Sequence, residues 1–136
     1  MKHLLAGMAI LLSATAACAD DRASVGAVQL ALLPDGSACR LLQLGADTDQ
    51  VIRLPLAGLC QFHRDPGGAL RVMDSPDGAI FLVETAVPKS DSPGDCDTQV
   101  LAVRMTANGP VAAATPARVA SCPPFQWDDV MFLGAF

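Results

Sequence analysis

Residues 79–86 (AIFLVETA) are the most strand-like segment of this 136-residue chain. Alternate side chains of a β-strand point to opposite faces, and here both faces are apolar. Ile80 and Leu82 fall on one face, and Phe81 and Val83 fall on the other. A strand with two apolar faces needs cover on both sides. We therefore expect residues 79–86 to be a central strand with other parts of the protein packed against each face.

Turn-forming residues divide the rest of the chain into short apolar runs. Residues 34–37 (PDGS), 65–68 (DPGG) and 75–78 (SPDG) combine proline, which presets φ, with glycine, which accepts a positive φ. Asn108-Gly109 is the strongest hairpin dipeptide. A polar lead-in at residues 20–24 precedes the strands. Strands are predicted at residues 25–33, 39–44, 51–56, 60–63, 70–73, 79–86, 98–105 and 111–115, with a short strand or helical turn at 127–132.

Short strands at this spacing predict an all-β domain. We expect a small disulfide-stapled barrel or sandwich of about seven to nine short antiparallel strands. The chain is long enough for a single domain, which we place at residues 20–136.

Residues 1–19 have the features of a cleaved signal peptide. Lys2 supplies a positive start, and residues 4–12 form an apolar core that is too short to span a bilayer as a helix. Ala17-Cys18-Ala19 is a small-residue cleavage site. We expect export to the periplasm or beyond, with an uncleaved anchor as the alternative. No later segment is long and apolar enough for a transmembrane helix.

Cys18 permits a second processing route. Residues 15–18 (TAAC) resemble a bacterial lipobox, whose cysteine is lipidated and becomes the first residue. The first position of that motif is usually Leu, whereas here it is Thr15. An outer-membrane lipoprotein with a lipid anchor at Cys18 is therefore the alternative localisation.

Four cysteines remain after the leader: Cys39, Cys60, Cys96 and Cys122. An even number of cysteines in an exported chain indicates two disulfides. Metal binding competes with this interpretation, but no two cysteines have CxxC spacing, and the leader is followed by a single histidine. Each sequential pair would close the open end of a predicted hairpin. The predicted disulfides are Cys39–Cys60 and Cys96–Cys122, each worth about 3 kcal/mol in the chain-entropy model.

The chain after the leader is acidic, because it keeps all fourteen Asp and Glu residues and loses Lys2. Repulsion from phosphates and the lack of a basic patch argue against nucleic acid as a partner. A cationic partner would be favoured, mostly in the rate and specificity of association. We prefer the simpler interpretation that negative charge keeps an apolar-rich exported protein soluble.

Asp91, Asp95 and Asp97 are the first group of candidate binding residues, in and beside a polar loop at residues 87–95. Calcium takes six to eight oxygen ligands, several of them from carboxylates. The spacing of these residues is not that of an EF-hand loop. We therefore expect a solvated acidic loop with no metal and no other cofactor, and leave calcium binding as the alternative.

Trp127, Asp128 and Asp129 are the second group, placed just after Pro123-Pro124. An exposed tryptophan is a frequent anchor for a protein partner. A buried tryptophan would instead plug the end of the β-core, which the burial tendency of the residue favours. Residues 87–95 and 125–129 are the surfaces to test for binding.

His63, Arg64 and Asp65 are the only place where an imidazole, a guanidinium and a carboxylate are adjacent. Neighbouring residues of a strand point to opposite faces, so adjacency does not make a catalytic triad. His63 also has no candidate nucleophile beside it. We expect a strand-end histidine with a solvated ion pair, and a hydrolase using His63 is the least favoured function.

The general form, an exported disulfide-stapled β-domain of this size, is similar to periplasmic inhibitor and immunity proteins of bacteria, including lysozyme inhibitors. The similarity is one of class, and no motif carries it. It implies a non-enzymatic periplasmic binding protein that acts on another protein through its loops or a sheet edge. The alternative is a small envelope lipoprotein with a structural or assembly role.

Overall fold

The computed structural model describes residues 21–45, 49–126, 128–134 and 136. The predicted signal peptide, Cys18 and Trp127 lie outside this part of the chain. The strands are β1 (Asp21–Val25), β2 (Val28–Asp35), β3 (Ala38–Leu44), β4 (Gln50–Ala57), β5 (Gln61–Phe62), β6 (Val72–Met73), β7 (Ile80–Pro88), β8 (Asp95–Thr106), β9 (Gly109–Ala112) and β10 (Ala117–Ser121), and α1 is Asp129–Gly134. The described chain contains no helix long and apolar enough to cross a membrane.

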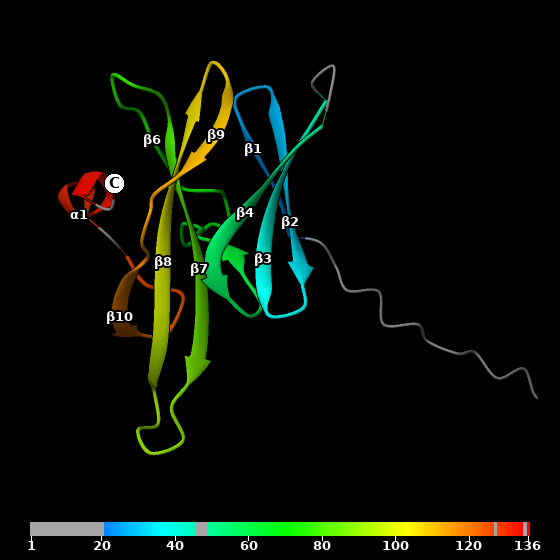
Figure 1. Cartoon of the computed structure of the whole chain (residues 1–136). Helices are drawn as coiled ribbons and strands as arrows, with labels where there is room; N and C mark the ends of the chain where they lie inside the picture. Colours follow the sequence, from blue (N-terminus) through cyan, green and yellow to red (C-terminus); the bar gives the residue numbers. More distant parts are fainter. Residues whose placement is uncertain (1–20, 46–48, 127, 135) are drawn as a thin grey trace, which may run out of the picture.

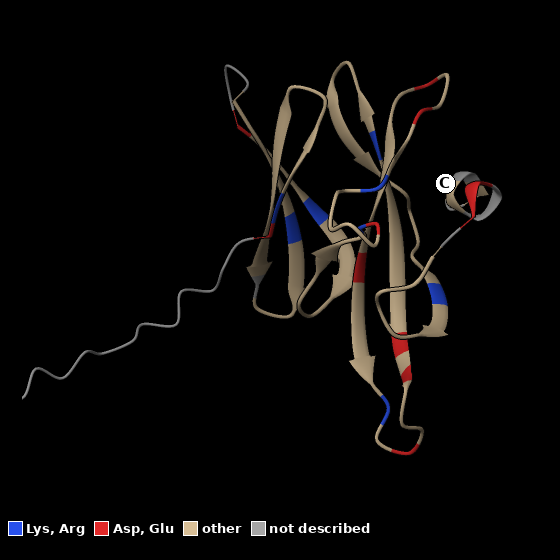
Figure 2. Ribbon diagram, turned by 180° about the vertical axis from the view of Figure 1, so that it is seen from behind, with Lys and Arg blue, Asp and Glu red and all other residues tan. Residues whose placement is uncertain are grey.

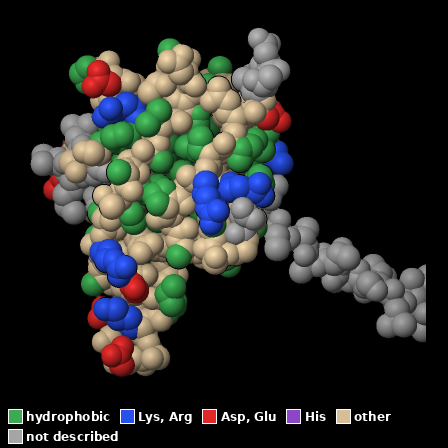
Figure 3. Space-filling model, in the orientation of Figure 1, with side chains coloured by type: hydrophobic (Ala, Val, Ile, Leu, Met, Phe, Trp, Pro, Cys, Tyr) green, Lys and Arg blue, Asp and Glu red, His purple; other side chains and the backbone are tan. Residues whose placement is uncertain are grey.

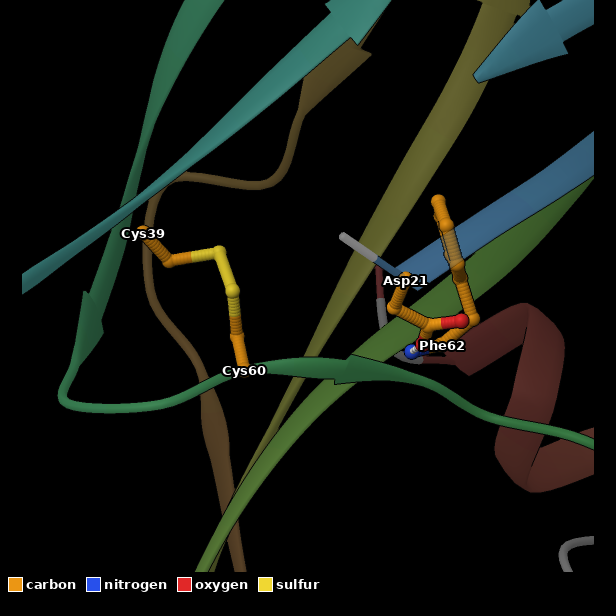
Figure 4. Close-up of a disulfide and its surroundings, with 4 residues drawn as sticks. All are labelled: Asp21, Cys39, Cys60 and Phe62. Atoms are coloured by element: carbon orange, nitrogen blue, oxygen red, sulfur yellow. Dashed lines mark hydrogen bonds between the residues drawn. A yellow bond between two sulfur atoms is a disulfide. The ribbon is translucent and has the colours of Figure 1, made fainter. Parts of the chain in front are cut away.

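The strands form two antiparallel sheets (Figure 1). Sheet A is a meander in the order β1-β2-β3-β4, and sheet B has the order β10-β8-β7-β5, with β6 beside β7 and β9 beside β8. Among the described strands, neither sheet closes into a barrel. Where β1 approaches β5, the backbone N–H of Phe62 donates to Asp21 Oδ2 at 2.7 Å, so a side chain replaces a strand ladder (Figure 4). The all-β prediction is confirmed, and its barrel alternative is not formed.

The described residues form ten strands, whereas about seven to nine were expected. Part of the difference is β1, which was expected to be a polar lead-in. It is a strand because Ala23 and Val25 alternate toward the core while β1 pairs along its whole length with β2. Another part is β10, which pairs with the first half of β8. The C-terminal helical turn, one of two expectations there, is α1.

One hydrophobic core joins the two sheets. Sheet A contributes Leu30, Leu32, Leu41, Leu54 and Leu56, and sheet B contributes Phe62, Phe81, Val83, Leu101 and Val103. Residues 80–85 of β7 are all buried, on both faces of the strand. The prediction of a central, doubly covered strand is therefore confirmed.

The C-terminal segment (residues 122–126, 128–134 and 136) covers the second face of sheet B. Phe125 lies 5.3 Å from the His63 ring, Arg71 stands 5.3 Å from the Phe132 ring, and Arg104 stands 4.1 Å from the Phe136 ring, measured to ring centroids. Phe132 is fully buried. This segment supplies the second layer that β7 needs.

Both predicted disulfides are present. Cys39–Cys60 closes the β3–β4 hairpin, as predicted (Figure 4). Cys96–Cys122 joins the start of β8 to the residue after β10, so the returning strand is β10 and not β9, which directly follows β8. Two disulfides indicate an oxidising, extracytoplasmic environment.

Candidate functional site

Sheet B buries a histidine and a glutamate side by side. His63 is 1% exposed and Glu84 is 2% exposed. The Nδ1 atom of His63 lies 3.0 Å from Glu84 Oε2, and Gln61 Nε2 donates to Glu84 Oε1 at 2.9 Å. Gln61 is directly opposite Glu84 in the β5–β7 ladder, and His63 follows two residues later on the same face. Strand register therefore assembles this polar cluster.

His63 directly follows β5 and is therefore a strand-end histidine, as expected, but the expected solvated environment is wrong, because its side chain is buried and pairs with a carboxylate. The partner is Glu84, 21 residues away, and both side chains are buried. Arg64 turns instead to Asp21, with Nη2 2.5 Å from Oδ1. Asp65 Oδ1 accepts a hydrogen bond from the backbone N–H of Ala69. The three adjacent side chains separate because they point in different directions at the strand end.

The environment of Glu84 is electrostatically unusual. A buried carboxylate is normally compensated by a cation. Within the described residues, the side chain of Glu84 is hydrogen-bonded to Gln61 and His63, and neither of these is a lysine or an arginine. Because a carboxylate can only accept hydrogen bonds, Nδ1 of His63 carries the hydrogen, and Nε2 is an acceptor whenever the ring is neutral. This Nε2 is buried and has no hydrogen-bond partner within the described residues.

A small cavity, here called the polar pocket, lies beside this pair and has a volume of about 140 Å³. Its lining residues are Asp21, Gln61, Phe62, His63, Arg64, Asp65, Glu84, Pro123 and Pro124. The lining thus holds three carboxylates and one guanidinium. The view in Figure 3 shows no histidine on the surface, in agreement with the burial of His63.

A larger cavity, here called the apolar groove, has a volume of about 400 Å³. It is lined by Leu59, Cys60, Gln61, Ala86, Pro88, Cys96, Cys122 and Pro123. The lining includes cysteines of both disulfides, so the groove lies where the two crosslinks come together. Leu59 is 80% exposed at its edge. Gln61 and Pro123 line both cavities, so the groove and the polar pocket are neighbours.

The first predicted group of acids lies at the β7–β8 end of the molecule (Figure 2). Asp91 is exposed between these strands, and Asp95 and Asp97 are exposed at the start of β8. Asp97 Oδ1 is 3.7 Å from Arg118 Nη1. Among the described residues, no group of three or more His, Cys, Asp or Glu side chains is arranged to hold a metal.

The second predicted group lies elsewhere. Asp128 and Asp129 are exposed, and Asp129 Oδ1 is 3.4 Å from Arg71 Nη2. Arg71 directly precedes β6, which pairs with the beginning of β7, whereas Asp91 follows the end of β7. The structure therefore does not bring the two acidic groups together. It brings together Glu84 and His63, a pairing that sequence reasoning missed.

No family model, no curated protein and no solved structure matches this chain. The site must therefore be interpreted from its own chemistry.

Proposed function

We propose that this protein is a non-enzymatic periplasmic binding protein that engages another protein through the apolar groove. The exposure of Leu59 carries this proposal. Leu59, 80% exposed, continues the uncharged lining of the groove to its edge, and a contiguous apolar surface of this kind is typical of protein interaction sites. Burial of such side chains in a partner is the usual source of interface energy.

The chemistry of the two cavities supports binding over catalysis. His63 and Glu84 have the geometry of an oriented imidazole, but the described residues that line the polar pocket include no serine, threonine or cysteine. The cysteines of the apolar groove are all held in disulfides. An oriented imidazole without a nucleophile gives no acyl-transfer site.

The groove also has a rigid frame. Cys39–Cys60 holds one side through sheet A, and Cys96–Cys122 holds the other through sheet B. A site held in its bound shape loses less entropy on association. The acidic residues Asp91, Asp95 and Asp97 stand at the same end of β7 and β8 as the groove, where they favour encounter with a cationic partner.

Affinity capture from native periplasmic extract tests this proposal. The full chain is expressed with its own leader, purified, immobilised, and compared with Leu59→Asp and Val111→Asp. Val111 is 49% exposed on β9 and lines neither cavity, so it is the matched control. We expect one stoichiometric protein on the wild type and on Val111→Asp, and its loss on Leu59→Asp. Recovery of the wild type alone, or equal capture by both variants, contradicts the proposal.

A further inference from the structure

We infer that the polar pocket binds the ammonium or guanidinium group of a lysine or arginine side chain. The inference rests on the proposed function for the source of that side chain, which is an extended segment of the partner. It predicts that the bound segment of the partner contains a cationic residue close to an apolar residue.

The charge of the pocket favours a cation. Three carboxylates line it, against one guanidinium. That guanidinium is already used within the protein, because Arg64 donates to Asp21 Oδ1 at 2.5 Å, to the carbonyl of Arg22 at 2.7 Å and to the carbonyl of Gly68 at 3.1 Å. When His63 is neutral, the two hydrogen-bond donors that Glu84 has within the described residues, His63 and Gln61, carry no positive charge. A bound cation would supply the missing positive charge.

The hydrogen-bonding groups of the pocket point to the same ligand class. The carboxylates of Asp21 and Glu84 accept hydrogen bonds. Nε2 of His63, which is an acceptor when the ring is neutral, is buried and has no partner within the described chain. An ammonium offers three donors and a guanidinium offers five, with no acceptor on either. An anionic or acceptor-rich ligand would face the same carboxylates and be repelled.

The neighbouring apolar groove explains how a partner reaches the pocket. Gln61 and Pro123 line both cavities, so one extended segment can place an apolar side chain in the groove and a cationic side chain in the pocket. The groove has no charged lining residue, so the two cavities select different side chains. The acidity of the whole protein favours the approach of such a segment.

A titration of the purified protein tests the inference without the partner. The probe is N-acetyl-lysine methylamide, and the readout is the ¹⁵N resonance of His63 Nε2. The neutral control probe is N-acetyl-norleucine methylamide, and sodium acetate is the anionic control. We expect a saturable shift with the lysine probe alone, and an affinity about tenfold or more weaker in Glu84→Gln. An arginine analogue in parallel shows which cation fits better.

Two further variants keep the test decisive. Asp21→Asn repeats it at the rim of the pocket, in case Glu84→Gln disturbs β7. Asp77→Asn removes one negative charge from a turn outside both cavities and should bind like wild type. Equal shifts with norleucine, a shift with acetate alone, or an unchanged affinity in both pocket variants overturns the inference. Leu59→Asp should keep the lysine titration, so loss of partner capture in that variant concerns the proposed function and not the pocket.

Discussion

Sheet A and sheet B use the same strand chemistry but differ in how many faces they bury. In β4 of sheet A, Leu54 and Leu56 are buried while Arg53 and Pro55 are exposed, so one face is solvated. In β7 of sheet B, residues 80–85 are buried on both faces, because the C-terminal segment covers the face that sheet A does not. The doubly covered sheet is also the one that encloses His63 and Glu84.

The same contrast separates two pairs of side chains that each contain a carboxylate, His63–Glu84 and Arg118–Asp97. The side chains of His63 and Glu84 are 2% and 3% exposed, whereas those of Arg118 and Asp97 are 70% and 58% exposed. A solvated pair costs little to form and contributes little. A buried carboxylate such as that of Glu84 loses its hydration, and the hydrogen bonds from His63 and Gln61 have to offset that cost.

The largest expected effect tests whether the outer faces of the two sheets really differ. Leu82→Ala on β7 removes a fully buried side chain and should lower the free energy of unfolding by about 2–5 kcal/mol. Leu33→Ala on β2 removes a half-buried leucine of sheet A and should cost less than half as much. Urea unfolding of both variants measures the difference. Equal losses would show that the C-terminal segment does not cover sheet B as described.

The next prediction, with an effect of intermediate size, compares the disulfide of sheet A with that of sheet B. Replacement of Cys39 and Cys60 by serine, or of Cys96 and Cys122 by serine, should each lower the free energy of unfolding by about 3 kcal/mol, because the closed loops are of similar length. Only the second double variant should also speed amide hydrogen exchange in α1, since Cys122 anchors the C-terminal segment. Faster exchange in α1 for both variants would contradict this assignment.

The smallest expected effect compares the His63–Glu84 pair with the Arg118–Asp97 pair. Glu84→Leu leaves the buried Nδ1–H of His63 without an acceptor and should cost about 1–3 kcal/mol. Asp97→Leu at the exposed pair should change the free energy of unfolding by less than about 0.5 kcal/mol. The double variant His63→Leu with Glu84→Leu should be more stable than Glu84→Leu alone, because no buried polar group is then left unpaired. Thermal and urea melts measure the three stabilities. A different order of stability among the variants would show that His63 and Glu84 do not stabilise each other as described.

Sequence reasoning predicted the parts of the fold that depend on near neighbours. Alternation of apolar residues placed the strands, and proline and glycine placed the turns. The disulfides were predicted correctly from hairpin closure, although for Cys96–Cys122 the returning strand was β10. That strand was missed because residues 117–121 (ARVAS) have few large apolar side chains, and their pairing with β8 supplies the order.

The candidate site was harder to predict. Glu84 is the only charged residue in the run 79–86, which is a signal that something must compensate it. The sequence does not show which residue compensates the charge of Glu84. Because His63 and Asp65 are close in sequence, Asp65 was considered as its partner. The clustering of acids in sequence led to Asp91, Asp95 and Asp97, which are exposed.

The sequence by itself determined the all-β class, the central strand and the cysteine pairing, because these follow from local alternation, turn chemistry and the closure of short loops. Only the tertiary structure decided that His63 meets Glu84 and that the apolar groove opens between the two disulfides. The physical reason is register. The pairing of Gln61 with Glu84 across 23 residues, and the return of the C-terminal segment over sheet B, come from packing between distant segments.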